Sequence, residues 1–190
     1  MGSGIFKAIF DDGYTDKILV GSITGVILAV LPKLSPPAVG AVYAFGIAIP
    51  LGMQAWVSFV AGPTMIRHLE RQTFSDIQSR LFPKFGLIGT SGSMIALVAQ
   101  QLLAGQGLGS MVSKVLLANL LGNVLNTGLL FPKQISALAQ MRDATNDDDK
   151  ARFRKTFGMF HGISMLVNFS AFAMNCWMLS GVGGSVAKMF

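Results

Sequence analysis

Four long runs without a charged side chain constrain this 190-residue chain more than any other feature of its sequence. They cover residues 36–66, 85–113, 115–132 and 156–187, and Lys114 alone separates the second run from the third. A helix of about 20 apolar residues crosses the roughly 30 Å hydrocarbon core of a bilayer, so each run is long enough to cross. Only 13% of the residues are charged, against about 25% in soluble domains. The sequence therefore predicts an all-α integral membrane protein.

Prolines, glycines and charged residues divide the chain into the expected helices. We expect four crossings, at residues 38–66, 85–103, 111–131 and 156–182, the last ending in the glycines that follow residue 180. Pro50 removes a backbone hydrogen bond within the first crossing and favours a kink there. These crossings predict a four-helix transmembrane bundle.

An additional apolar stretch, residues 18–31, precedes the bundle. Its 14 residues make about 21 Å of helix, short of the hydrocarbon core, so both a fifth crossing and an interfacial segment stay open. Gly21 and Gly25 form a GxxxG spacing that lets another helix approach closely. We expect two parts: an N-terminal extension with a short apolar helix at 1–37, and a four-helix domain at 38–190.

The basic residues gather between the apolar stretches and indicate the topology. Residues 67–84 and 132–155 carry ten Lys and Arg between them, whereas the turn at 104–109 carries none. Loops rich in Lys and Arg face the cytoplasm or an equivalent compartment, so both should lie on one side of the membrane. Within them we expect a short interfacial helix at 73–78 and a solvated acidic linker at 147–149. The net charge of +6 therefore indicates topology and does not predict nucleic-acid binding.

Small and polar side chains recur at helical spacing inside the apolar stretches. In a bilayer, such residues mark the faces on which helices pack, so we expect all these faces to lie inside the bundle. They are Gln54, Ser58 and Gly62; Gly86, Gly89, Ser93, Ala96 and Gln100; Asn119, Asn123 and Asn126; and His161, Ser164, Asn168, Ala171 and Asn175.

These intramembrane polar faces have two interpretations. Their amides either bond to one another and hold the helices together, or line a cavity that binds a ligand. No Asp, Glu, Lys or Arg lies at bilayer depth in these stretches, which argues against a proton-coupled or ion-coupled transporter. His161 lies near a helix start, where we expect it to bond to a neighbouring carbonyl rather than to carry protons.

The residue types needed for catalysis are scarce. Cys176 is the only cysteine, which excludes an intrachain disulfide and a cysteine metal cluster. The two histidines, His68 and His161, cannot build a diiron site or a zinc-protease motif. The acidic residues near the N-terminus argue against a leader peptide. We expect no enzymatic activity, no cofactor and no metal.

Several separated motifs resemble the transmembrane protein 205 family. The resemblance begins at the segment from Gln54 to Gly62 and extends over residues 46–182, although the N-terminal extension and the short, Asp-rich last loop depart from the pattern. It implies a four-helix membrane domain without established enzymatic activity, some of whose members are associated with trafficking and drug resistance. The matching residues are Gln54, Trp56, Gly62, Arg67, Arg71, Phe82, Pro83, Asn126, Pro132, His161, Gly162, Ser164 and Asn168.

Two functions are compatible with these observations. The first is a non-catalytic accessory or scaffold subunit of a larger membrane assembly, with the lipid bilayer and other membrane-protein subunits as partners. A mitochondrial respiratory complex is one host that we consider, and the sequence leaves open whether the membrane is the mitochondrial inner membrane or an endomembrane. The second is a transporter or trafficking protein for small molecules or lipids that uses the Asn-lined interior.

Overall fold

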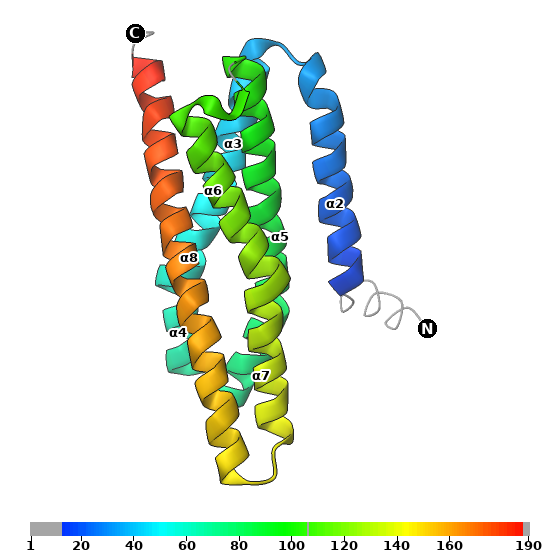
Figure 1. The fold of residues 1–190 in the computed structure, drawn as a ribbon, viewed down its shortest axis with the longest axis vertical. Coiled ribbons are helices and arrows are strands. Elements are labelled where there is room, and N and C mark those ends of the chain that lie inside the picture. Colours follow the sequence, from blue (N-terminus) through cyan, green and yellow to red (C-terminus); the bar gives the residue numbers. More distant parts are fainter. Residues whose placement is uncertain (1–12, 106, 188–190) are drawn as a thin grey trace.

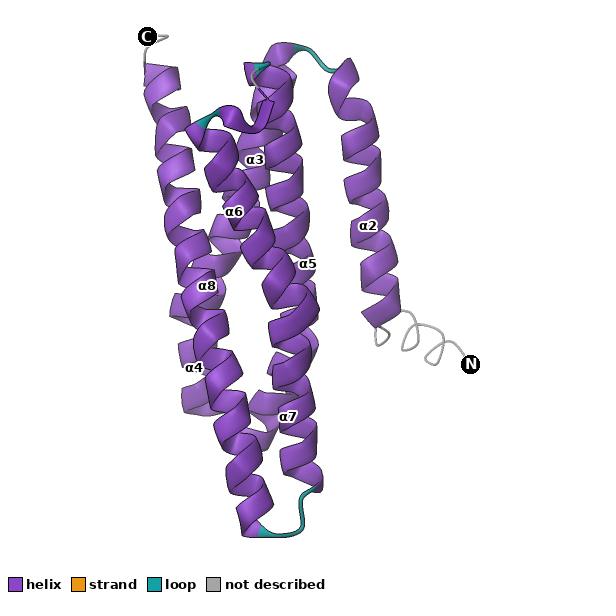
Figure 2. Ribbon diagram, in the orientation of Figure 1, coloured by secondary structure: helices purple, strands orange, loops and turns teal. Residues whose placement is uncertain are grey.

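The structure is a computed structural model, and it describes residues 13–105 and 107–187. The first 12 residues, on which the expectation about a leader peptide mainly depends, lie outside the described residues. Helices form every regular element of this part of the chain (Figures 1 and 2). The α-helices are α2 (Gly13–Val30), α3 (Pro36–Ala55), α4 (Gly62–His68), α5 (Arg71–Ala104), α6 (Met111–Leu125), α7 (Phe131–Asp143) and α8 (Asp147–Ala187). The shorter helical segments between them are η1 (Leu31–Lys33), η2 (Trp56–Ala61), η3 (Gly107–Gly109) and η4 (Asn126–Leu130).

Four long helical rods form the bundle. The segment η2 joins α3 to α4, and η4 joins α6 to α7, so that two rods run without interruption over Pro36–His68 and Met111–Asp143. With α5 and α8 they make four helices long and apolar enough to cross a membrane. The four-helix membrane bundle with an extra N-terminal helix is therefore confirmed, and the chain is an integral membrane protein.

The two joints η2 and η4 are π-helical turns, and each is followed by a proline, Pro63 or Pro132. Proline has no N–H to donate to the preceding turn. The residue before each proline donates instead to the carbonyl five positions back: Gly62 to Val57 and Phe131 to Asn126. The wider turn thus accommodates the proline without ending the rod. At Pro50, where the sequence favours a kink, α3 continues.

The predicted long loops are wrong. Only Leu69 and Glu70 lie between α4 and α5, and the segment expected as a separate interfacial helix is part of the 34-residue α5. Only residues 144–146 separate α7 from α8. Charged residues end a membrane span but do not end a helix, because their side chains are well solvated outside the bilayer. At about 1.5 Å per residue, α5 reaches about 51 Å, longer than the hydrocarbon core.

Both ends of α8 differ from expectation. The acidic run predicted as a linker forms its first turn, where Asn146 Oδ1 accepts the Asp149 N–H at 2.7 Å and negative charge is favourable. At its other end α8 continues through the glycines to Ala187. Glycine lowers helix propensity but does not by itself end a helix.

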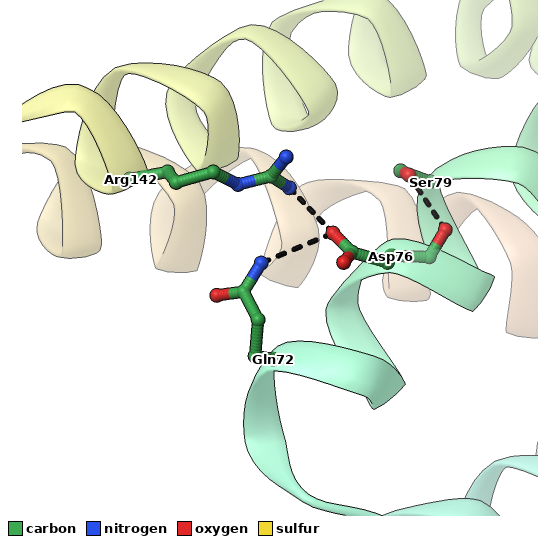
Figure 3. Close-up of polar contacts among 4 residues, drawn as sticks. All are labelled: Gln72, Asp76, Ser79 and Arg142. Carbon is green, nitrogen blue, oxygen red and sulfur yellow. Dashed lines mark hydrogen bonds and ion pairs between the residues drawn. The ribbon is translucent and has the colours of Figure 1, made fainter.

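The two charged junctions lie at the same end of the bundle, as the charge distribution predicts, and the turn after α5 lies at the other end (Figure 1). We call the end that carries the α4–α5 and α7–α8 junctions the loop side. There Asp76 on α5 accepts hydrogen bonds from Arg142 on α7 at 2.5 Å and from Gln72 at 3.1 Å (Figure 3). The charged side chains of this pair are about half exposed, so the pair contributes at most about 1 kcal/mol.

The apolar core lies in the half of the bundle opposite the loop side. It joins η1, α3, α5, α6 and α8 and comprises Leu31, Val39, Tyr43, Ile47, Ala96, Ala99, Leu116 and Met178. Next to it α3 and α5 approach closely: a Cβ added to Gly92 would lie 2.7 Å from the Gly46 carbonyl oxygen. Gly105 ends α5 in the left-handed conformation with φ 59°, which glycine adopts without strain.

The extra helix α2 lies beside α5, outside the bundle (Figure 1). Its 18 residues make about 27 Å of helix, because it extends through Asp16 and Lys17 before the apolar stretch. Asp16 forms an ion pair with Lys84 of α5. This length approaches the thickness of the hydrocarbon core.

Candidate functional site

Gln54 of α3 lies at the centre of the polar interior and bonds to α8 through both atoms of its amide. Its Nε2 donates to Asn168 Oδ1 at 3.2 Å, and its Oε1 accepts from Asn175 Nδ2 at 3.0 Å. Asn175 Oδ1 in turn accepts from Asn119 Nδ2 of α6 at 2.6 Å. One glutamine and three asparagines therefore connect three of the four rods.

Asn123 extends these contacts to the fourth rod. Its Nδ2 donates to Asn119 Oδ1 at 2.9 Å and to Ser93 Oγ of α5 at 3.1 Å. Ser93 Oγ donates onward to the Gly89 carbonyl at 2.9 Å. At the other end, Asn168 Nδ2 lies 3.4 Å from Ser58 Oγ in η2. We call the connected residues the interior polar chain: Ser58, Asn168, Gln54, Asn175, Asn119, Asn123 and Ser93.

Glycines on α5 make room for these side chains. A Cβ added to Gly89 would lie 2.6 Å from Asn123 Oδ1, and one added to Gly86 would lie 2.4 Å from Thr127 Oγ1. Gly86 and Gly89 of the predicted stripe thus face the rod formed by α6, η4 and α7 and let it approach closely, whereas Ala96 of the same stripe lies against Gly46 of α3.

The members of the interior polar chain are neutral, and their amides are nearly inaccessible. Gln54 and Asn119 are 1% exposed and Asn175 is 2% exposed. Each donated hydrogen meets an oxygen of a neighbouring helix or turn, which is how buried polar groups avoid an unfavourable loss of solvation. Such a chain can hold helices together, but it contains no ionisable group that could bind charge or move a proton.

A second group of polar side chains lies nearer the loop side. His161 Nδ1 of α8 is 3.2 Å from Gln134 Oε1 of α7, and the His161 ring stacks on Phe157 with centroids 5.3 Å apart. The partner of His161 is thus the carbonyl oxygen of a side-chain amide on the neighbouring helix α7. Three buried amide atoms here have no partner among the described residues: Gln78 Oε1, Asn126 Oδ1 and Gln134 Nε2.

The structure places the predicted polar residues in three situations. Gln54, Asn119, Asn123, Asn168 and Asn175 meet in the interior polar chain. Asn126 and Ser164 are buried without belonging to it. Gln100 is half-buried, and its side chain forms no hydrogen bond to the described residues; the side chain of the adjacent Gln101 donates to Ser113 Oγ at 2.8 Å instead.

Most residues of the family motifs lie at the surface or near the loop side. Trp56 is 62% exposed and points away from the bundle interior. Phe82 stacks on Phe131 of α7 with centroids 5.2 Å apart. Arg67, Arg71, Pro132 and Gly162 are exposed, whereas Gly62 and Pro83 are partly buried.

Sequence reasoning missed Gln78 and Gln134, which are 7% and 0% exposed. Gln78 stands in the segment predicted as an interfacial helix and Gln134 in a predicted loop, and both lie outside the predicted membrane spans. Gln134 is eight residues beyond Asn126, a spacing that returns to the same face of a helix. A helix extended past Pro132 would therefore have placed Gln134 on the face that carries the asparagines.

The described residues contain no group of three or more His, Cys, Asp and Glu that could hold a metal ion. One shallow apolar pocket of about 210 Å³ lies between η1 and the end of α5, where Leu31, Pro36, Leu102 and Leu103 contribute to its walls. It lies away from the polar interior, so the polar residues remain the candidate site.

Comparison with known proteins matches the chain to a family model and to curated relatives. A family model described as "Domain of unknown function (DUF4149)" matches residues 45–143, just over half of the chain. The chain is also 39% identical over 51 residues to the protein named Transmembrane protein 205 from Danio rerio. That alignment covers 27% of this chain and 27% of the relative, so the chain spans about a quarter of the relative's length. No solved structure matches the chain significantly.

Proposed function

The chain belongs to the family described as the domain of unknown function DUF4149, and we propose that it is a non-catalytic structural subunit of a larger membrane assembly. The observation that carries the proposal is the interior polar chain, in which amides from three rods bond to one another and to a serine hydroxyl of the fourth rod, α5. A ligand site would leave such groups free for the ligand. Paired amides instead fix how the four rods are arranged.

The outer surface supports the assembly part of the proposal. Gly21 and Gly25 of α2 have no atom within 4 Å of an added Cβ, whereas Gly46 and Gly92 are in close contact inside the bundle. The GxxxG spacing of α2 therefore packs against none of the residues that the structure describes. We propose that it accepts a transmembrane helix of another subunit, because small residues at this spacing favour close helix packing in lipid.

The basic ends of the rods support a proposal for the orientation of the chain in the membrane. We propose that the loop side faces the cytoplasm or the mitochondrial matrix, because exposed Lys and Arg concentrate there. The mitochondrial inner membrane, with a respiratory complex as the host assembly, and an endomembrane are the two locations compatible with this orientation. The name of the Danio rerio relative says only that it is a transmembrane protein.

Isolation from the native membrane tests this function. We expect the wild-type chain, extracted in mild detergent, to migrate with other membrane proteins as one defined complex. Replacing both Gly21 and Gly25 with Leu should remove it from the complex, since each leucine fills the contact surface of α2. The matched control replaces the exposed Ile23 with Leu and should leave migration unchanged.

Two results would refute the proposal. One is a wild-type chain that migrates alone in every mild detergent. The other is a double variant that stays in the complex as well as the control does, which would exclude α2 as the contact.

The alternative is a transporter or trafficking protein for small molecules or lipids. The observation that favours it is the set of three buried amide atoms without a partner, since unsatisfied polar groups inside a membrane often belong to a site. A passage through the membrane would also have to cross the interior polar chain, whose amides bond to one another.

A further inference from the structure

The loop-side half of the interior contains polar atoms that no described residue satisfies. Gln134 of α7 is fully buried, and its Nε2 has no partner. The same holds for Oε1 of Gln78 on α5 and for Oδ1 of Asn126 in η4, which are 7% and 2% exposed as residues. A buried amide atom without a hydrogen bond is unfavourable, so a molecule that supplies the missing bonds is expected there.

The register of the helices brings Gln78 and Gln134 to the same level. Phe82 of α5 stacks on Phe131 of α7. Gln78 lies four residues before Phe82, and Gln134 lies three residues after Phe131. Because the two helices run in opposite directions, both glutamines lie about one turn from the aromatic pair, on the same side of it.

A third helix, α8, contributes His161 to this group of polar residues, because His161 Nδ1 lies 3.2 Å from Gln134 Oε1. The neighbouring Lys133 is exposed, which indicates that this level is close to the aqueous boundary. Asn126 lies deeper, about 12 Å further along the rod at 1.5 Å per residue. The unpartnered atoms therefore extend from the loop-side boundary into the membrane.

Either orientation of the Gln134 amide leaves one of its two polar atoms without a partner among the described residues. Rotating an amide by 180° exchanges its oxygen and nitrogen. If Gln134 is rotated, its nitrogen donates to His161 and its oxygen becomes the unpartnered atom. One atom of the amide stays without a partner in either orientation.

We propose that water enters from the loop side and occupies a blind pocket between α5, α7 and α8, where it bonds to Gln78 and Gln134 and reaches Asn126. Water suits these atoms because one molecule both donates to an amide oxygen and accepts from an amide N–H. The pocket ends beyond Asn126. One turn further into the membrane, Asn123 bonds to Asn119 and Ser93 within the interior polar chain, so its donor is already paired. This inference is independent of the proposed role as a subunit.

Two glutamines of equal burial provide the test. In lipid bilayers containing protein labelled with 15N at glutamine side chains, solid-state NMR can follow the transfer of polarisation from water to each amide. We expect the Gln134 signal to build up several-fold faster than that of Gln54, which is 1% exposed but bonded through both amide atoms. The variant Gln134→Met identifies the signal by removing it.

A second variant measures the same water through stability. If water bonds to Gln78, replacing it with Met, which has a similar shape, should lower the thermal midpoint by a few degrees because those bonds are lost. In a dry pocket the replacement would remove an unsatisfied group and leave the midpoint unchanged or raised. The proposal is overturned if the water-transferred NMR signal of Gln134 builds up as slowly as that of Gln54. It is also overturned if Gln78→Met leaves the thermal midpoint unchanged or raises it.

Discussion

Replacing Asn175 with Leu lowers the free energy of unfolding by roughly 1–3 kcal/mol. Asn175 accepts from Asn119 at 2.6 Å and donates to Gln54 at 3.0 Å, so it is the residue through which α3, α6 and α8 meet. Leucine removes both bonds and leaves two nearly inaccessible amides facing an apolar side chain. Each lost bond contributes about 0.6–1.7 kcal/mol in a membrane, and the unpaired partners add to the loss.

Equilibrium unfolding in mixed micelles measures this effect. Cys176 is adjacent to Asn175 on α8 but exposed, so Cys176→Leu introduces the same side chain at the surface of the same helix and serves as the control. We expect the control to change stability by less than about 0.5 kcal/mol. Equal stability of the two variants would mean that the interior polar chain does not hold the rods together.

The second large effect is expected at Gly92, where α5 approaches α3. An added Cβ would lie 2.4 Å from Pro50 Cγ and 2.7 Å from the Gly46 carbonyl oxygen. A proline ring and a backbone carbonyl cannot move aside as a flexible side chain can. Gly92→Ala therefore forces the two helices apart and lowers stability by about 1–3 kcal/mol, the usual cost of overpacking.

Gly162→Ala is the matched control for this variant. Gly162 lies inside α8, is exposed and has no atom within 4 Å of an added Cβ. There alanine should stabilise the helix by about 0.5–1 kcal/mol, because it restricts the unfolded chain more than glycine does. The same unfolding measurement compares the two, and a Gly92→Ala protein as stable as Gly162→Ala would contradict the close approach of α3 and α5.

The membrane rods and their inner faces are predictable from the sequence because few physical rules determine them. Uncharged length predicts the four spans, and the spacing of Asn119, Asn123, Asn168 and Asn175 predicts which faces turn inward, where all four are buried. Which amides pair could not be predicted. Spacing orders residues along one helix but does not fix the register between two helices.

The helix boundaries were harder to predict than the membrane boundaries. Charge density shows where lipid ends, and it predicts a helix start after Lys84 and a helix end at Pro132, whereas α5 already begins at Arg71 and α7 continues to Asp143. The backbone follows a different rule, since a proline can be accommodated by a π-turn and charged residues are compatible with a solvated helix. The same assumption concealed Gln134, whose burial depends on α7 continuing beyond Pro132.

The division into residues 1–37 and 38–190 remains a prediction, as do the absence of enzymatic activity and the role of the family motifs. Trp56 shows why sequence similarity alone does not assign a role. It belongs to the matching motif, yet it is largely exposed on the outside of the bundle. A tryptophan there is compatible with contact to lipid or to another subunit.

The central claim is that the polar interior holds the bundle together and provides no passage, and Asn123→Leu tests it most directly. Asn123 connects α6 to Ser93 of α5, and the interior holds only neutral groups there, so glycerol is a suitable neutral probe. We expect proteoliposomes of wild type and variant to be no more permeable to glycerol than empty liposomes, while the variant loses about 1 kcal/mol of stability. Glycerol uptake by wild type that disappears in Asn123→Leu, with stability unchanged, would contradict the claim.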